Sequence, residues 1–391
     1  MVWVWVVLLA VLSLWVGWRL LLRSFVRQYF TKNYAPIQLS ESQLGYFPPN
    51  HHLQDVPWCS TRETYCQANT LQMITHQQGR TASRDEINFL MGFTYGASAL
   101  PKIGFSPFTD PEPGHAVAAP YLGLVRHYYV THDPKLYLRA LRFYLSRGHP
   151  LHVPLDYAVL YGLRGFIPHS NLLVGYDQNG FYYYETVAMQ GSSLEPGFRA
   201  PGEQGLWVSN EKLLEAALSQ SRHFKQPWRY AFALFEPWPT QSDLKLVWRR
   251  NARLLMGGEK YGPKQGADAI AQTANQIQKH WHSINPQEMC LFLDSAAYTR
   301  RDNADFLRTH FAEEEGILRA ANLLEQAAQL YRSVQKTIRK GLRSQAEANQ
   351  VAAWLNEAAS AEWEVGSIFA RVAHTSKQPA PQTDDIEKTQ P

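Results

Sequence analysis

The chain has 391 residues, of which 45% are hydrophobic and 18% charged, and it contains 12 Trp, 20 Tyr and 18 Phe. This composition is typical of a globular protein long enough for two domains, and it excludes a largely disordered chain. The net charge of +4 is too small for the positive field of most nucleic-acid-binding proteins, so we expect no nucleic-acid partner. The three cysteines, Cys59, Cys66 and Cys290, form no evenly spaced set, which argues against a disulfide scaffold and favours a reducing compartment.

Residues 1–30 are predicted to form a transmembrane anchor. The run Val2–Trp18 has no charged side chain, and a helix of about 20 apolar residues spans a bilayer. Four tryptophans lie towards its two ends, as interfacial aromatics do: Trp3, Trp5, Trp15 and Trp18. The tryptophans argue against a buried core helix. A cleaved signal peptide is disfavoured because no basic residue precedes the run and no small-x-small cleavage site follows it.

The charges that flank this run predict its orientation. Four basic residues follow it: Arg19, Arg23, Arg27 and Lys32. By the positive-inside rule we expect a single-pass protein of the inner (cytoplasmic) membrane with its body in the cytoplasm. A periplasmic or lumenal body is the alternative.

Residues 31–57 are polar and contain prolines, which predicts a connector, and residues 58–237 carry mixed helix and strand signals. Helices are expected at 66–77, 83–90, 133–147 and 211–218, and strands at 151–155, 171–176, 181–186 and 230–235. Asp177–Gly180 is the expected hairpin turn. This order predicts an α+β domain rather than an alternating βαβ domain.

Residues 238–375 lack strand signals and show helical periodicity, which predicts an all-helical second domain. Residues 376–391 are polar and without periodicity, so a disordered tail is expected. The basic stretch 245–253 is expected to be a solvated helix face or a contact for anionic headgroups or an acidic carrier protein.

Cys66 is the candidate nucleophile because it opens a predicted helix, and a helix N-terminus favours the thiolate. A buried, inert Cys is the structural alternative, and Cys59 is a rival nucleophile. His169 begins a predicted strand, and Glu185 follows sixteen residues later on the strand that returns beside it. A His oriented by an acid is the usual base for a catalytic thiol. Asp177 is a rival acid, although the turn that it begins explains it more simply.

Two segments carry a resemblance to a known family. YCQANTLQMITHQQG, from Tyr65, resembles the nucleophile helix of papain-like proteins of the bacteriocin-processing-peptidase type, and HSNLLVGYDQNGFYYYET, from His169, resembles their histidine and acid strands. The body as a whole, about residues 58–373, is more similar to the butirosin biosynthesis protein H family. Three further passages contribute: PLHVPLDYAVL from Pro150, DNADFLRTHFAEEEGILRAANLLEQAAQLYRSV from Asp302 and LNEAASAEWEVGSIF from Leu355.

The resemblance implies a papain-like cysteine-protease-type domain followed by a helical domain. It also implies an acyltransferase that moves an acyl group from a carrier-protein thioester to an amine, with Cys66 as nucleophile, His169 as base and Glu185 as acid. With the anchor, the predicted function is a membrane-anchored acyltransferase that uses an acyl carrier protein or acyl-CoA as donor and an amine or hydroxyl acceptor. The alternatives are a cysteine peptidase or amidase, and a non-catalytic papain-like scaffold.

The peptidases keep an oxyanion-hole Gln some six residues before the Cys, where this chain has Ser60, and their acid is commonly Asp rather than Glu. One oxyanion donor is worth about 100- to 1000-fold in rate, which favours a thioester donor over a peptide. Gln67 or backbone amides near Cys66 are the expected substitutes. Asp156 is expected either to line the site or to make a structural hydrogen bond.

No cofactor and no metal are expected. His51-His52 and His280-Trp281-His282 have no companion ligands at a recognisable metal-binding spacing.

Overall fold

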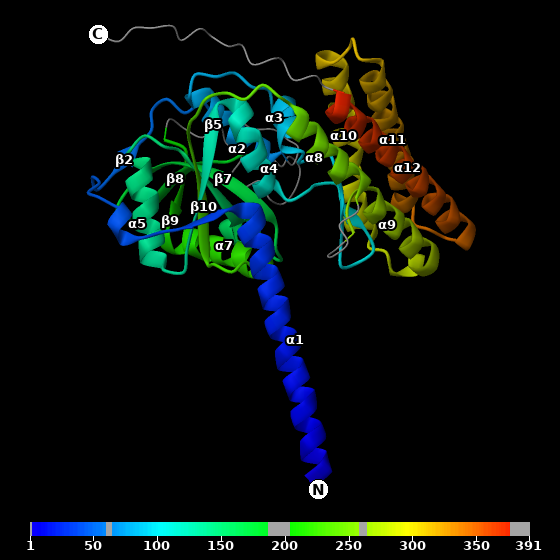
Figure 1. Cartoon of the computed structure of the whole chain (residues 1–391), viewed down its shortest axis with the longest axis horizontal. Coiled ribbons are helices and arrows are strands. Elements are labelled where there is room, and N and C mark those ends of the chain that lie inside the picture. The colour runs from blue at the N-terminus through cyan, green and yellow to red at the C-terminus, as the bar shows by residue number, and fades with distance from the viewer. Residues whose placement is uncertain (1, 60–64, 187–203, 258–263, 376–391) are drawn as a thin grey trace. The chain divides into compact units, whose positions relative to one another are not determined.

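The computed structural model describes residues 2–59, 65–186, 204–257 and 264–375 (Figure 1). The chain divides into two compact units. Unit 1 comprises Met1–Met91 and Asp110–Gln241, and unit 2 comprises Gly92–Thr109 and the chain from Ser242 onward. A segment from the middle of the first predicted domain therefore belongs to the second unit, whereas the sequence suggested a single boundary near residue 237.

Unit 1 is built around an eight-stranded mixed sheet in the order β1-β5-β10-β6-β7-β8-β9, with β2 paired to β7. The strands are β1 Pro36–Gln38, β2 His51–His52, β5 Leu124–Thr131, β6 Leu151–Asp156, β7 Pro168–Tyr176, β8 Gly180–Tyr184, β9 Leu206–Ser209 and β10 Tyr230–Pro237. Only the β1–β5 pair among the described strands of this sheet is parallel. The segment expected to be a connector thus contributes β1 and β2 to the sheet.

The hairpin β7–β8 is fixed by the turn that the sequence predicts. The Asp177 carboxylate accepts hydrogen bonds from the amides of Asn179 and Gly180, each at 2.7 Å. This Asx turn sets the register in which Tyr176 lies opposite Phe181, and a β-bulge between Leu173 and Gly175 then shifts it so that Leu172 lies opposite Tyr184. The start of β7 is thereby brought beside the residues that follow β8.

The helices of unit 1 are mostly capped by the side chain that precedes them. They are α1 Val2–Tyr34, α2 Cys66–Gln77, α3 Arg84–Met91, α4 Pro111–Ala118, α5 Pro134–Leu145, α6 Tyr157–Tyr161 and α7 Asn210–His223, with short 3-10 turns η1 Glu41–Gln43 and η2 Ala119–Leu122. The carboxylates of Asp110, Asp133 and Asp156 cap α4, α5 and α6, and the Ser209 hydroxyl caps α7.

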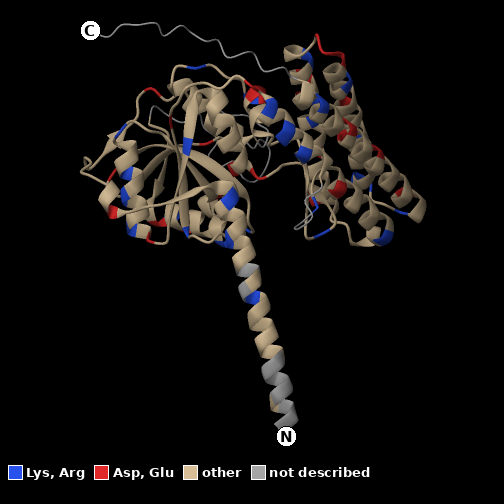
Figure 2. Cartoon of the chain, in the orientation of Figure 1, with Lys and Arg blue, Asp and Glu red and all other residues tan. Residues whose placement is uncertain are grey.

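The predicted transmembrane anchor is wrong. In the part of the chain that the structure describes, no helix is both long and apolar enough to cross a membrane. The apolar run ends at Arg19, and α1 continues without a break to Tyr34. This last part of the helix contains Arg27 and Lys32, and its residues Phe30 and Tyr34 are buried in unit 1. Figure 2 shows basic positions along α1. The predicted single-pass location in the inner membrane falls with the anchor.

Unit 2 is helical apart from one short hairpin. Its helices are α8 Lys245–Met256, α9 Gly266–His280, α10 Pro286–His310, α11 Glu315–Arg339 and α12 Gln345–Thr375, with a 3-10 turn η3 Trp281–Ser283 and the hairpin β3 Ser98–Ala99 and β4 Phe105–Ser106. Its core is rich in alanine, which lets the helices approach closely, and it includes Phe105 from β4. Ala97 O accepts from the amide of Gly266, and the amide of Ala99 donates to Lys264 O, so the hairpin is hydrogen-bonded to the start of α9.

The predicted fold class is therefore wrong as stated. We predicted an α+β papain-like domain, an all-α domain and a transmembrane helix. The structure has a mixed sheet with a parallel edge pair, no membrane-spanning helix among the described residues, and a helical unit that includes a hairpin taken from the middle of the chain. The tail at 376–391 lies outside the described residues.

Candidate active site

Cys66 is the first residue of α2, and its side chain is largely buried. The start of α2 is held against the sheet by two polar contacts. The Asn69 amide donates to Thr186 O at 2.6 Å, and the Thr70 hydroxyl, which donates to Cys66 O at 2.9 Å, lies 3.5 Å from the Ser170 hydroxyl on β7. The thiol is thereby fixed beside the first residues of β7.

His169 and Glu185 meet because β7 and β8 are antiparallel. His169 lies near the start of β7, and Glu185 follows the last residue of β8. The Nε2 atom of His169 is 2.5 Å from Oε1 of Glu185. The imidazole also makes a side-chain hydrogen bond with Cys66, and since Nε2 faces Glu185, Nδ1 is the nitrogen left for the thiol. The structure thus brings together the three residues that the sequence singled out.

Glu185 is held on several sides by groups that the sequence analysis missed. Its Oε2 accepts from the Tyr161 hydroxyl at 2.6 Å, and its Oε1 accepts from the amide of Thr186 at 2.8 Å. The side-chain amide of Asn171 also lies beside this pair, 3.2 Å from Oε1 of Glu185 and 2.9 Å from Nε2 of His169. Asn171 follows His169 by two residues and so lies on the same face of β7, a signal that the period of a strand provides. No pattern in the sequence points to Tyr161, because it lies on α6 and only the fold places it beside Glu185.

The electrostatics of the pair favour the charged forms of both partners. Burial works against protonation of His169, but the charge of Glu185 and hydrogen bonds with Cys66 and Glu185 outweigh it and raise the pKa of His169 to about 10. Burial likewise raises the pKa of Glu185, but the charge of His169 and hydrogen bonds from His169, Tyr161 and the Thr186 amide leave it below its usual value. At neutral pH the site therefore holds an imidazolium beside a carboxylate, with a thiol on the other side of the ring.

This arrangement has the parts of a covalent catalyst. An imidazolium next to a Cys at a helix N-terminus stabilises the thiolate, which is the nucleophilic form. The same imidazolium can return its proton to a leaving group. Tyr157 packs edge-on against the imidazole with ring centroids 5.0 Å apart, which limits rotation of the ring.

The candidate oxyanion groups are Gln67 and the backbone amides at the start of α2. Gln67 is buried, and within the described part of the chain its side-chain oxygen has no hydrogen-bond partner. Ser60, at the position of the peptidases' Gln, lies outside the described residues. The side chain of the N-cap residue, Tyr65, makes no cap hydrogen bond to α2, and the first backbone amides of a helix have no partner within the helix. These amides are the groups that fit an oxyanion best.

Asp156 has a structural role. Its Oδ1 accepts from the amides of Ala158 at 3.0 Å and Ile167 at 3.1 Å, and its Oδ2 accepts from the Ser219 hydroxyl at 2.6 Å. The carboxylate is buried and both oxygens are occupied. Of the two roles expected for Asp156, the structure supports the structural hydrogen bond and gives it no substrate-facing oxygen.

The rival residues lie elsewhere. Sγ of Cys59 lies 4.0 Å from Nδ1 of His76. His76 is ten residues after Cys66 on α2, so at about 1.5 Å per residue the two positions are about 15 Å apart. Burial raises the pKa of Cys59, which disfavours its thiolate. Asp177 occupies the turn at the opposite end of β7 from His169.

A further buried cluster was not anticipated. Within the described part of the chain, Glu112, His115 and His152 are the one set of three potential metal ligands that converge. His51, His52, His280 and His282 do not take part. The signal available in the sequence was the Glu112–His115 spacing on α4, whereas the contribution of His152 from β6 depends on the fold.

Comparison with known proteins adds no assignment. No known family model matches the chain, and no curated protein does either.

Proposed function

We propose that this chain is an acyltransferase that works through a thioester between an acyl group and Cys66. The observation that carries the proposal is the 2.5 Å contact between His169 and Glu185 together with the hydrogen bond between His169 and Cys66. The resemblance to the butirosin biosynthesis protein H family supports the same reaction. The expected donor is an acyl carrier protein or coenzyme A thioester, and the expected acceptor is an amine or hydroxyl.

The reaction takes place in two steps, acylation of Cys66 and transfer of the acyl group to the acceptor, and each step passes through a tetrahedral oxyanion. The Cys66 thiolate attacks the donor carbonyl, and the oxyanion is stabilised by the backbone amides at the first turn of α2. Collapse breaks the bond to the donor sulfur, which takes the His169 proton and leaves as a thiol, so that His169 becomes neutral. An acceptor then loses its proton to His169 and attacks the Cys66 acyl group, and the Cys66 thiolate leaves. Glu185 keeps the imidazole oriented and stabilises its charged form.

A cysteine peptidase or amidase is the second candidate, and one observation favours it. An amine leaving group must be protonated as it departs, and the raised pKa of His169 keeps a proton available for this step. Water would then resolve the acyl-enzyme. The same three residues serve both reactions, so the donor and the acceptor distinguish them.

The test is intact-mass analysis of the full chain incubated with a panel of acyl thioesters. We expect an adduct with the mass of one acyl group on the wild-type protein and on Cys59→Ala, and none on Cys66→Ala. The Cys59→Ala variant is a matched control because Cys59, which is half-buried, also lies beside a His but away from Glu185. An adduct that survives Cys66→Ala, or no adduct with any donor, would remove the basis of the proposal.

A pH series distinguishes the donor class. Above the His169 pKa of about 10 the imidazole is neutral and cannot protonate a leaving group. We expect the rate of Cys66 acylation by an amide donor to fall about tenfold per pH unit in that range, because an amine cannot leave unprotonated. Acylation by a thioester should not fall, since a thiol with a pKa of about 8.5 leaves as the thiolate. The Cys66→Ala variant measures the spontaneous hydrolysis of each donor, and this rate is subtracted.

A further inference from the structure

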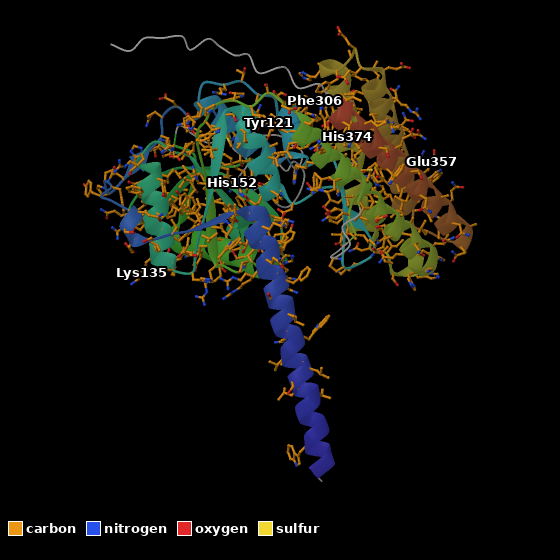
Figure 3. All side chains as sticks on the ribbon, in the orientation of Figure 1. Tyr121, Lys135, His152, Phe306, Glu357 and His374 are labelled. Atoms are coloured by element: carbon orange, nitrogen blue, oxygen red, sulfur yellow. The ribbon has the colours of Figure 1, made fainter. Side chains whose placement is uncertain are left out.

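A buried polar cluster joins α4, β5 and β6 to the first turn of α2. Oε1 of Glu112 lies 3.1 Å from Nε2 of His152, which Figure 3 labels, and Oε2 lies 3.1 Å from Nη1 of Arg126. Nε2 of His115 is 3.3 Å from the main-chain oxygen of Gln67. His115 and His152 are fully buried, and Glu112 and Arg126 nearly so. Gln67 directly follows Cys66, so the cluster ends at the residue next to the nucleophile.

The Glu112 carboxylate already has a partner on each oxygen without an added ion. The Arg126 guanidinium lies at Oε2 and the His152 imidazole at Oε1, each at 3.1 Å. Burial lowers the pKa of His115 more than Glu112 raises it, so His115 is neutral. A divalent cation held by Glu112, His115 and His152 would leave uncompensated positive charge beside Arg126 in a site closed to water, which is costly. The contacts therefore favour a hydrogen-bonded support over a metal centre.

The tautomer of His115 follows from its neighbours. A neutral imidazole carries one proton, and the Gln67 carbonyl can only accept, so the proton is on Nε2. Nδ1 lies 3.8 Å from Oε2 of Glu112, beyond hydrogen-bond distance. His115 thus donates one hydrogen bond, and it donates it to the first turn of α2.

The cluster is itself anchored from two directions. Nη2 of Arg126 donates to Tyr34 O at 3.0 Å, and the Tyr34 hydroxyl donates to Asp110, the residue that caps α4, at 2.9 Å. Glu112 and His115 lie one turn apart on that same helix. The end of α1, the start of α4 and strand β5 therefore fix the position of His115.

We propose that His115 is a positioning residue that sets the first turn of α2, through its hydrogen bond to the Gln67 carbonyl, and thereby aligns the Cys66 thiol with His169. Loss of the bond lets the turn shift, and a displacement of about 1 Å at a reacting atom costs on the order of 100-fold in rate. The inference rests on the proposed function, since it takes Cys66 as the nucleophile. It identifies a residue outside the group Cys66, His169 and Glu185 that holds Cys66 in position.

The test measures alkylation of Cys66 by iodoacetamide in the full chain carrying Cys59→Ala and Cys290→Ala, so that Cys66 is the one thiol. His115→Leu removes the donor at similar volume, whereas His115→Gln places an amide N–H where Nε2 was. We expect His115→Leu to lower the second-order rate at pH 7 by about 10- to 100-fold. His115→Gln should restore it to within about threefold, a pattern that a general loss of stability would not produce. If His115→Leu fails to fold, His115→Asn, whose amide is too short to reach Gln67, takes its place.

Equal rates for wild type, His115→Leu and His115→Gln would overturn the inference and leave His115 a core residue. One equivalent of metal in the purified wild-type protein, lost in His115→Gln together with Cys66 reactivity, would overturn it in favour of a cation site. The assay needs no substrate, so its outcome is separate from that of the acyl-adduct experiment. A protein that forms no acyl adduct and yet shows the His115 pattern would refute the proposed function and keep the positioning role.

Discussion

Replacing His169 with Gln is expected to lower the rate of Cys66 acylation at pH 7 by about 10⁴-fold or more, the scale seen when a member of a nucleophile–base pair is removed. The imidazolium stabilises the Cys66 thiolate that attacks the donor, and the same ring moves protons in both steps. Its proton is retained because Glu185 raises its pKa to about 10 despite burial. The measurement is a single-turnover acylation rate with a thioester donor from pH 6 to pH 11.

The pH profile distinguishes loss of the imidazole's chemical role from a general loss of structure in the His169→Gln variant. An ordinary thiol ionises near pH 8.5, so His169→Gln should recover part of its acylation rate above about pH 9. Glu185→Gln keeps a hydrogen-bonding group beside the ring but removes the charge, and we expect a smaller loss of about 10- to 100-fold at pH 7 that also recovers at high pH. A His169→Gln variant with no loss at pH 7, or equal loss at every pH, would contradict the role given to His169. The double variant His169→Gln/Glu185→Gln controls for the unpaired buried carboxylate.

The local elements with strong periodicity could be read from the sequence. The helix Cys66–Gln77 and the turn at Asp177 were predicted in place, because an apolar helical period and an Asx turn are local signals. The strand β5 was missed. The third residue of β5 is Arg126, which looks like a surface residue in the sequence but has its side chain buried against Glu112 in the structure. The burial of a charged residue can be predicted only when its partner is known. The partner of Arg126 is Glu112, which lies on another element, α4.

The anchor prediction failed for a different reason. Composition favours a membrane span, but the run Val2–Trp18 is shorter than the stretch of about 20 apolar residues that crosses a bilayer, and Arg19 ends it. In this chain α1 continues past Arg19 into residues that pack in unit 1. Cys66, His169 and Glu185 could be selected as candidates because a helix start, a strand start and the end of the returning strand each have a pattern. Tyr161 and His115 were not found, since each reaches the site from an element that only the fold brings close.

Unit 2 contains a buried ion pair whose loss should have the second large effect. Arg300 on α10 is fully buried, and its Nε and Nη2 atoms lie 2.7 and 2.8 Å from the Glu362 carboxylate on α12. The guanidinium also donates to the main-chain oxygens of Thr94, Gly96 and Pro107, which flank the β3–β4 hairpin. Arg300→Met removes the donor for both the helix pair and the hairpin. Because one partner of a buried ion pair is left alone, we expect the free energy of unfolding of unit 2 to fall by about 3–5 kcal/mol.

The neighbouring Arg301 is a matched control, since it lies on the same helix with its side chain 46% exposed. Arg301→Met should change stability by less than about 0.5 kcal/mol. Hydrogen exchange of peptides from α10, α12 and the segment Gly92–Thr109 resolves the effect by region, and Arg300→Met should lower protection in all three. Arg300→Met/Glu362→Leu should recover part of the loss in α10 and α12, since no charge then remains unpaired, but not in the hairpin, whose carbonyls still lack their donor. Loss confined to the helices in the single variant would mean that the hairpin is held by its apolar contacts, such as Phe105 against the core, and that Arg300 serves the helices alone.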